Sequence, residues 1–187
     1  MIATARPAGA RRSYVAVNLL LVAVGCKPPD GQDEVDPDIA PPVTGQEDIE
    51  QWFSEGHYQG WACEASSHAA DMPSPHGRVR LCANPIIHPD SPGEHPLSSA
   101  MVIEIRDPTS GAIIGHGAQV HTAAGTRGLD WYWYMKVPLD NATPHDATGL
   151  AADGWGYDGP AAEVCTACHT MAGTTGHEGH DFVWVVP

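Results

Sequence analysis

Two cysteines and a histidine near the C-terminal end of the chain have the spacing of a covalent haem-attachment site. Cys165, Cys168 and His169 occur in the order Cys-Thr-Ala-Cys-His. Two thiols at this spacing reach the two vinyl groups on one edge of a porphyrin, and the adjoining imidazole binds the iron as an axial ligand. We therefore predict one haem c, attached to both cysteines, with His169 as the axial ligand.

Two other kinds of site share part of this pattern. A redox-active Cys-x-x-Cys pair is expected within a strand–helix–strand unit, which the surrounding sequence does not predict. A zinc site needs a second pair of ligands at metal-binding spacing, and none stands out in the sequence. Haem attachment is favoured because it accounts for the adjoining histidine as well as for the cysteines.

Residues 1–25 have the features of an export signal. Three arginines precede an apolar run, 14–24, which is too short to span a bilayer. The run ends at Cys26 in the order Ala-Val-Gly-Cys, which resembles a bacterial lipobox with alanine where leucine is usual. We predict a lipid on Cys26, which would anchor an exported protein in the periplasm or at the cell surface. A plain signal peptide or an uncleaved anchor is the alternative.

The other two of the five cysteines are then Cys63 and Cys82. In an oxidising compartment they are candidates for one disulfide. Its loop of about twenty residues would add on the order of 3 kcal/mol by restricting the unfolded chain. Two buried free thiols are the alternative.

Net charge and composition restrict the partners and the domain organisation. A net charge of −14 argues against a nucleic acid or an anionic membrane surface as partner. It favours a basic redox partner or a small neutral ligand. The segment 26–43, rich in Pro and Asp, is predicted to be an extended tether, and 44–187 has the length of one folded domain.

One helix is predicted at the start of this domain. Thr44 and Glu47 have the spacing of a capping box, and Gly56 stands where a helix ends. Between them three apolar residues recur at helical spacing and predict a stripe that faces the core: Ile49, Trp52 and Phe53.

Most of the domain is predicted to be β-structure. Alternating apolar and polar residues, with turn residues between them, predict strands at 78–83, 100–106, 112–121 and 129–137, and a closing strand at 181–186. The segment between the last two is predicted to be rich in loops up to the haem motif. The predicted fold class is α+β, a mainly antiparallel sheet with a few short helices and one covalently bound haem c.

Three segments together resemble the C-terminal signature of the cytochrome P-460 family, which includes the cytochromes c′-beta. They are Gly-Trp-Gly-Tyr at 154–157, the haem motif at 165–169 and Asp-Phe-Val-Trp at 181–184. The aromatic run 131–134 is similar to an earlier strand of that family. The resemblance covers about residues 60 to 187. It implies a mainly antiparallel β fold, one haem c with an open distal side, and in many members a homodimer.

The resemblance implies one of two chemistries. One branch of the family has a lysine cross-linked to the haem and oxidises hydroxylamine, while the other binds nitric oxide and similar small ligands. The chain has two lysines, and Lys27 lies beside the lipid site, so a cross-link would depend on Lys136. Ile103 stands before Glu104 where the resemblance implies a lysine. We therefore favour binding or conversion of nitric oxide or a related nitrogen species. Hydroxylamine oxidation through Lys136 is the alternative, so enzymatic activity remains open.

A second protein ligand to the iron would instead make the protein a six-coordinate electron carrier. Met171 follows His169 too closely to pass around the edge of a porphyrin. The candidates for such a ligand are His180 and His121, with His116 and His177 free of the same limit.

The distal pocket would be built from strand residues. Trp131 and Trp133 alternate along one strand and are candidates for an aromatic wall, with Lys136 at the end of that strand. Glu104 and Asp130 are candidate proton-transfer groups if they point inward. As charged strand residues, both are expected to face solvent.

Overall fold

The computed structural model describes residues 36–70, 76–87, 93–125, 127–156, 162–174, 179, 181–184 and 187. The predicted export signal, the lipid site at Cys26, Lys27, His177 and His180 lie outside these ranges. Residues 34–187 form one compact unit. No helix among the described residues is both long and apolar enough to cross a membrane.

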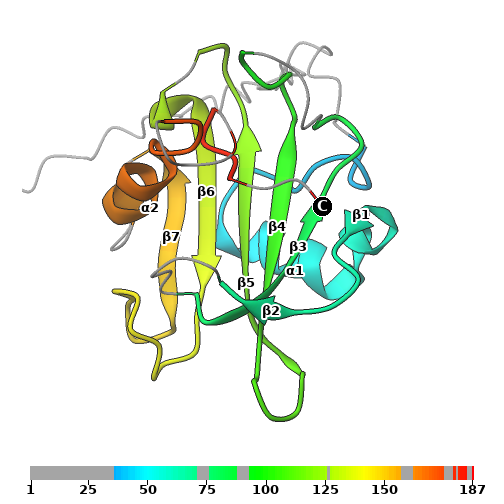
Figure 1. The fold of residues 1–187 in the computed structure, drawn as a ribbon, viewed down its shortest axis with the longest axis vertical. Helices are drawn as coiled ribbons and strands as arrows, with labels where there is room; N and C mark the ends of the chain where they lie inside the picture. Colours follow the sequence, from blue (N-terminus) through cyan, green and yellow to red (C-terminus); the bar gives the residue numbers. More distant parts are fainter. Residues whose placement is uncertain are drawn as a thin grey trace, which may run out of the picture. The chain divides into compact units, whose positions relative to one another are not determined.

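An antiparallel sheet forms the centre of this unit (Figure 1). Its neighbouring strands follow the order β1-β3-β4-β5-β6-β7, and β2 also pairs with β3. The strands are β1 (Ala62–Cys63), β2 (His68–Ala69), β3 (Arg78–Ala83), β4 (Ala100–Arg106), β5 (Ile113–His121), β6 (Trp131–Lys136) and β7 (Leu150–Trp155). The helices are α1 (Gln46–Glu55), η1 (His57–Gly60), η2 (Gly128–Asp130) and α2 (Ala162–His169). The mainly antiparallel α+β class predicted from the sequence is confirmed.

The strands with strong apolar alternation form where they were predicted, and two predictions at the C-terminal end were wrong. Leu150–Trp155, expected to be loop, forms β7 and pairs with β6. The predicted closing strand at 181–186 is not formed by its described part, 181–184, which has a turn and a single bridge residue. Asp181 and Phe182 have φ angles of 43° and 67°, and a strand requires negative φ.

The two faces of the sheet pack against different elements. Trp131, Trp133 and Met135 of β6 belong to one hydrophobic cluster, against which Cys165 of α2 also packs. The residues that alternate with them, Tyr132 and Tyr134, belong to a second cluster with the side chains of α1. We call these the α2 face and the α1 face. In Figure 1, α1 lies behind the sheet and α2 lies beside β7.

Helix α1 has the predicted C-terminus but not the predicted N-terminus. Gly45 is the N-cap and makes no side-chain capping bond, so the expected box beginning at Thr44 is absent. Instead, Asp153 of β7 accepts a hydrogen bond from the backbone N–H of Gln46 at 3.0 Å. Gly56 ends the helix with φ 77°. The predicted apolar stripe is buried in the α1-face core, so tertiary packing replaces the local cap.

Part of the predicted tether packs on this same core. Ala40 is buried among the α1-face residues. The indole N–H of Trp52 donates to the carbonyl of Pro37 at 2.6 Å, and that of Trp61 donates to the carbonyl of Asp38 at 2.8 Å. Buried indole groups need acceptors, and the backbone of residues 36–43 supplies them.

A disulfide joins β1 to the sheet. Cys63 and Cys82, the pair expected from the sequence, occupy opposite positions of β1 and β3. Their sulfur atoms are bonded, and their Cα atoms lie 4.0 Å apart. The bond therefore holds the two-residue strand β1 at the edge of the sheet.

Candidate haem-attachment site

All three residues of the haem motif lie on helix α2 (Ala162–His169). Residues three and four positions apart share one side of a helix, so Cys168 and His169 both lie near Cys165. Both cysteines are free thiols; Cys165 is half-buried against the α2-face core and Cys168 is exposed. Helix α2 therefore directs the Cys165 thiol toward the core and leaves the Cys168 thiol exposed to solvent.

The imidazole of His169 is held in one tautomer. Its Nδ1 lies 2.7 Å from the carbonyl oxygen of Phe182, and because a carbonyl can only accept, Nδ1 carries the proton. Nε2 then keeps its lone pair, which is the form that a metal-binding histidine needs. Burial lowers the pKa of His169 and so favours this neutral form. The ring also makes an edge contact with Trp133, with ring centroids 4.9 Å apart.

A left-handed turn places the carbonyl that His169 uses. Asp181 and Phe182 both have positive φ, which is uncommon for residues other than glycine and costs on the order of 1 kcal/mol or more for each residue. The carboxylate of Asp181 accepts a 2.8 Å hydrogen bond from the backbone N–H of His95, and the side chain of Phe182 is buried. These contacts hold the turn against its strain.

Helix α2 is fixed on η2 by close packing. Thr166 is 1% exposed, and its hydroxyl donates to the carbonyl of Gly156 at 2.7 Å. Its Cγ2 atom would lie 1.9 Å from a Cβ atom at position 128, so only glycine fits there. The carbonyl of Gly128 in turn accepts the indole N–H of Trp133 at 3.1 Å.

The two thiols are not activated. Burial raises the pKa of Cys165 to about 11, and it also raises the pKa of Cys168. A redox-active Cys-x-x-Cys pair has a thiol of lowered pKa, which provides the attacking thiolate. The environment of α2 therefore disfavours the redox-pair interpretation.

The candidate distal groups Lys136 and Glu104 lie on the α1 face, opposite Cys165. The ammonium group of Lys136 is 2.7 Å from a carboxylate oxygen of Glu50 in α1. Glu104 is 3% exposed, so the expectation that it faces solvent was wrong. Burial acts to raise the pKa of Glu104, but hydrogen bonds from Arg106 and Tyr58 outweigh burial, and the net shift is downward.

Asp130 is also buried rather than solvent-facing. It is 3% exposed, and its carboxylate pairs with the guanidinium of Arg127 at 2.8 Å. The hydrogen bond from Arg127 lowers the pKa of Asp130. Both charged candidates were misassigned for the same reason: a nearby arginine makes burial of a carboxylate tolerable.

The two tryptophans of the predicted aromatic wall have different surroundings. Trp133 contacts His169 itself, so it lies beside the candidate axial ligand. Trp131 is fully buried and stacks on His121, with centroids 4.7 Å apart. Of the two tryptophans in the predicted wall, only Trp133 contacts His169.

Both ring nitrogens of His121 lie against backbone carbonyl groups in this structure. Its Nδ1 lies 2.7 Å from the carbonyl of His95, and its Nε2 lies 3.1 Å from the carbonyl of Gly125. Each ring nitrogen therefore faces a backbone oxygen rather than an open position for iron. The other candidate for a second ligand, His180, lies outside the described residues.

Sequence reasoning assigned no role at the haem to His76, which lies within electrostatic range of His169. Burial, together with the nearby His169, lowers the pKa of His76 to about 4. Gly128 was missed, and Phe182 was noted only as part of the family-like segment 181–184, with no role assigned to its carbonyl. The Phe182 carbonyl reaches His169 because the turn has positive φ, and Gly128 matters because α2 packs closely against it. Both features arise only in the folded chain.

The donor set fits a haem better than a bare metal ion. Among the described residues, no group of three or more His, Cys, Asp or Glu side chains is arranged to hold a metal ion. Zinc needs such a group, whereas a porphyrin supplies four ligands of its own and needs one imidazole from the protein. Two free thiols and a histidine of fixed tautomer on one helix meet that need.

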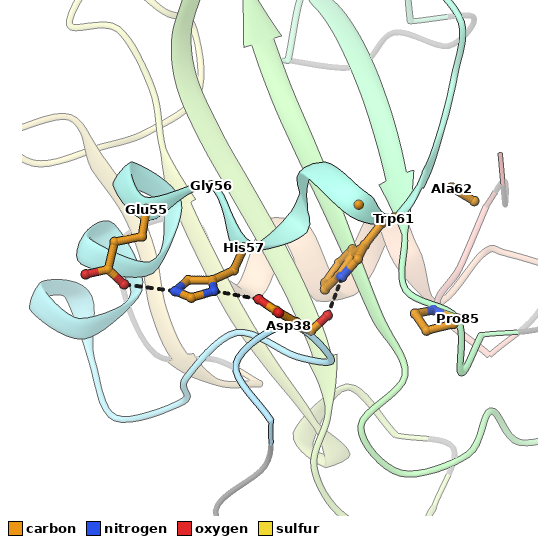
Figure 2. Close-up of a pocket in the computed structure, with 8 residues that line it drawn as sticks. Asp38, Glu55, Gly56, His57, Trp61, Ala62 and Pro85 are labelled. Carbon is orange, nitrogen blue, oxygen red and sulfur yellow. Dashed lines mark hydrogen bonds and ion pairs between the residues drawn. The ribbon is translucent and has the colours of Figure 1, made fainter.

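A second feature of the surface is a cavity of about 450 Å³ beside η1, lined in part by Asp38, Glu55, His57 and Trp61 (Figure 2). The ring of His57 bridges the two carboxylates, at 2.7 Å from Asp38 and 2.8 Å from Glu55. These hydrogen bonds raise the pKa of His57. Because both of its ring nitrogens are engaged, His57 offers no free nitrogen to a molecule in this cavity.

Comparisons of the chain with protein-family models, with curated proteins and with solved structures found no match.

Proposed function

We propose that this protein is a haem c protein that binds a small neutral ligand such as nitric oxide. Cys165 and Cys168 would hold the haem by thioether bonds, and His169 would be its axial ligand. The observation that carries the proposal is the 2.7 Å hydrogen bond from His169 Nδ1 to Phe182, on a helix with two free thiols at attachment spacing. The choice of nitric oxide or a similar small molecule as the ligand rests on the resemblance to the cytochrome P-460 family.

When bound, the haem supplies an iron centre that can bind a small ligand or carry one electron. The chain supplies two thiols for attachment and an imidazole whose proton is kept on Nδ1. Trp133 and the buried Phe182 give this imidazole an apolar environment. Such surroundings disfavour an uncompensated charge beside the axial ligand.

Two contacts favour ligand binding over the alternative functions. Lys136 is paired with Glu50 on the α1 face, away from Cys165, which disfavours a lysine cross-link and the hydroxylamine chemistry that depends on it. His121 has both ring nitrogens bonded to backbone carbonyls, which disfavours this histidine as a second axial ligand. An iron with one protein ligand keeps a position for a small molecule.

Export is part of the same proposal. The Cys63–Cys82 disulfide is typical of proteins outside the cytoplasm. The predicted signal at 1–25 would provide the export route, and the lipid predicted on Cys26 would provide the anchor. The net charge of −14 favours a basic redox partner if electrons reach the haem from another protein.

The test is to express the full chain with and without a c-type haem-ligation system. Denaturing electrophoresis with haem staining and intact mass should show one haem retained on the wild-type chain. Cys165→Ala and Cys168→Ala should each abolish attachment through that thiol, while Cys63→Ser, whose sulfur lies in the disulfide, should keep the haem. A wild-type chain with no added mass would refute the proposal.

Ligand binding is tested next on the protein that carries haem. Addition of nitric oxide or carbon monoxide to the reduced protein should change its visible spectrum. A low-spin spectrum that neither gas changes would refute the ligand-binding function in favour of an electron carrier.

A further inference from the structure

The carbonyl of Phe182 accepts hydrogen bonds from two side chains. Nδ1 of His169 lies 2.7 Å away, and the amide nitrogen of Gln119 lies 3.4 Å away. Gln119 is in β5 and is 6% exposed. Its cross-strand neighbours on the α2 face are Met101 and Trp133, so it is a polar residue at an otherwise apolar position.

A buried amide in this place needs a reason, because burial of a polar group is costly unless it is hydrogen-bonded. The turn that presents the Phe182 carbonyl is itself strained, with two consecutive non-glycine residues at positive φ. Strain of this kind is kept where the surrounding structure enforces it, often at functional sites. The strained turn and the buried amide meet at one oxygen atom, and the third group at that atom is the candidate iron ligand.

The two donors compete for the electron density of the same carbonyl. A carbonyl oxygen has two lone pairs, so it can accept both bonds. When the Gln119 amide donates, the oxygen becomes a weaker acceptor for the Nδ1 proton of His169. The imidazole then keeps less negative charge and is a weaker donor to iron, and the low dielectric of a buried site strengthens this effect.

We propose that Gln119 is a positioning residue for the axial ligand, which acts through the Phe182 carbonyl to set how strongly His169 donates to iron. This inference rests on the proposed haem attachment at His169. It assigns a role to a residue outside the Cys-Thr-Ala-Cys-His motif, on a strand distant from it in the sequence.

The test compares Gln119→Leu with wild type in the haem-bearing full chain. Leucine has a similar size but no donor, so the His169 hydrogen bond should strengthen. The iron–histidine stretching frequency of the reduced protein should rise, and the reduction potential should become more negative. Met101→Leu is the matched control, since Met101 is the similarly buried cross-strand neighbour, and it should leave both quantities at their wild-type values.

The outcomes separate this inference from the function it depends on. Wild-type protein without covalent haem would refute the haem function itself. Haem-bearing Gln119→Leu with an unchanged frequency and potential would refute the role of Gln119 and leave haem attachment standing. If the variants do not fold, solvent exchange of the Gln119 side-chain amide protons in the wild-type protein decides the question. Slow exchange of one proton is expected, and fast exchange of both would overturn the inference.

Discussion

Replacement of Gly128 by alanine tests how helix α2 is held on the sheet. A Cβ at position 128 would lie 1.9 Å from Cγ2 of Thr166 and 3.2 Å from its Cβ, and the first distance is far inside van der Waals contact. Thr166 cannot rotate away freely, because its hydroxyl donates to the carbonyl of Gly156 in a buried position. Gly128→Ala must therefore either move α2 or break that hydrogen bond.

The expected loss of stability in Gly128→Ala follows from these two structural responses. Adding a methyl group to a packed core costs about 1–3 kcal/mol, and loss of a buried hydrogen bond adds about 1 kcal/mol. We expect Gly128→Ala to lower the free energy of unfolding by about 2–4 kcal/mol on these terms. Thr166→Ser removes Cγ2 but keeps the hydroxyl, and by itself should cost about 1 kcal/mol. In the Gly128→Ala background the same change should instead stabilise the protein, because it removes the atom that clashes.

Urea unfolding of the wild type, both single variants and the double variant measures this coupling. The expected interaction energy between positions 128 and 166 is about 1–3 kcal/mol in favour of the double variant. Gly60→Ala is the control, since a Cβ there meets no atom within 4 Å, and its effect should stay within about 0.5 kcal/mol. Strictly additive losses in the double variant would show that the contact between these residues does not fix α2.

Three further predictions concern the sheet and the α1 face. Replacing Cys63 and Cys82 together by serine should lower the free energy of unfolding by on the order of 3 kcal/mol in non-reducing urea titrations; no change would mean that the bond does not constrain the unfolded chain. Glu104→Gln should destabilise the protein at neutral pH. Because the folded-state pKa of Glu104 is lowered, its contribution is present above the ordinary Glu pKa and is lost as pH falls through the lowered value, so the two unfolding curves should converge in acid. Lys136→Met should leave haem attachment intact and, because its ion pair with Glu50 is partly exposed, should change stability by about 0–1 kcal/mol; loss of a haem-linked peptide on this change would favour the cross-link.

Alternation of apolar residues was enough to predict most of the sheet. The run from Trp131 to Lys136 has large side chains at every position, so it forms a strand whichever face is covered. The sequence did not indicate which face α2 would cover, and therefore which of these residues would meet the haem motif. That choice depends on the docking of Thr166 against Gly128, a contact between distant segments that no local pattern encodes.

The missed elements have weak local signals and strong tertiary ones. Strand β7 is Leu-Ala-Ala-Asp-Gly-Trp, a sequence of low β-propensity, and it forms because it pairs with the strongly β-prone β6. The turn at Asp181 and Phe182 looks like a strand by composition, yet the bond from the His95 N–H to Asp181 and the bond from His169 to the Phe182 carbonyl hold it at positive φ. In both places contacts across the fold outweigh intrinsic preference.

The separation of the two sheet faces also bears on which ligand the site would accept. Charged residues of the strands, including Glu104, Lys136 and Asp153, make their contacts on the α1 face with Tyr58, Glu50 and Gln46. Cys165 packs against the apolar cluster of the α2 face, and the buried polar residue beside that cluster, Gln119, carries no charge. A charged substrate such as an anion would lose its hydration there without gaining a counter-ion, whereas a neutral diatomic molecule would lose little. If haem is attached to Cys165 as proposed, this distribution of charge favours a neutral ligand on the side of the haem that faces the cluster.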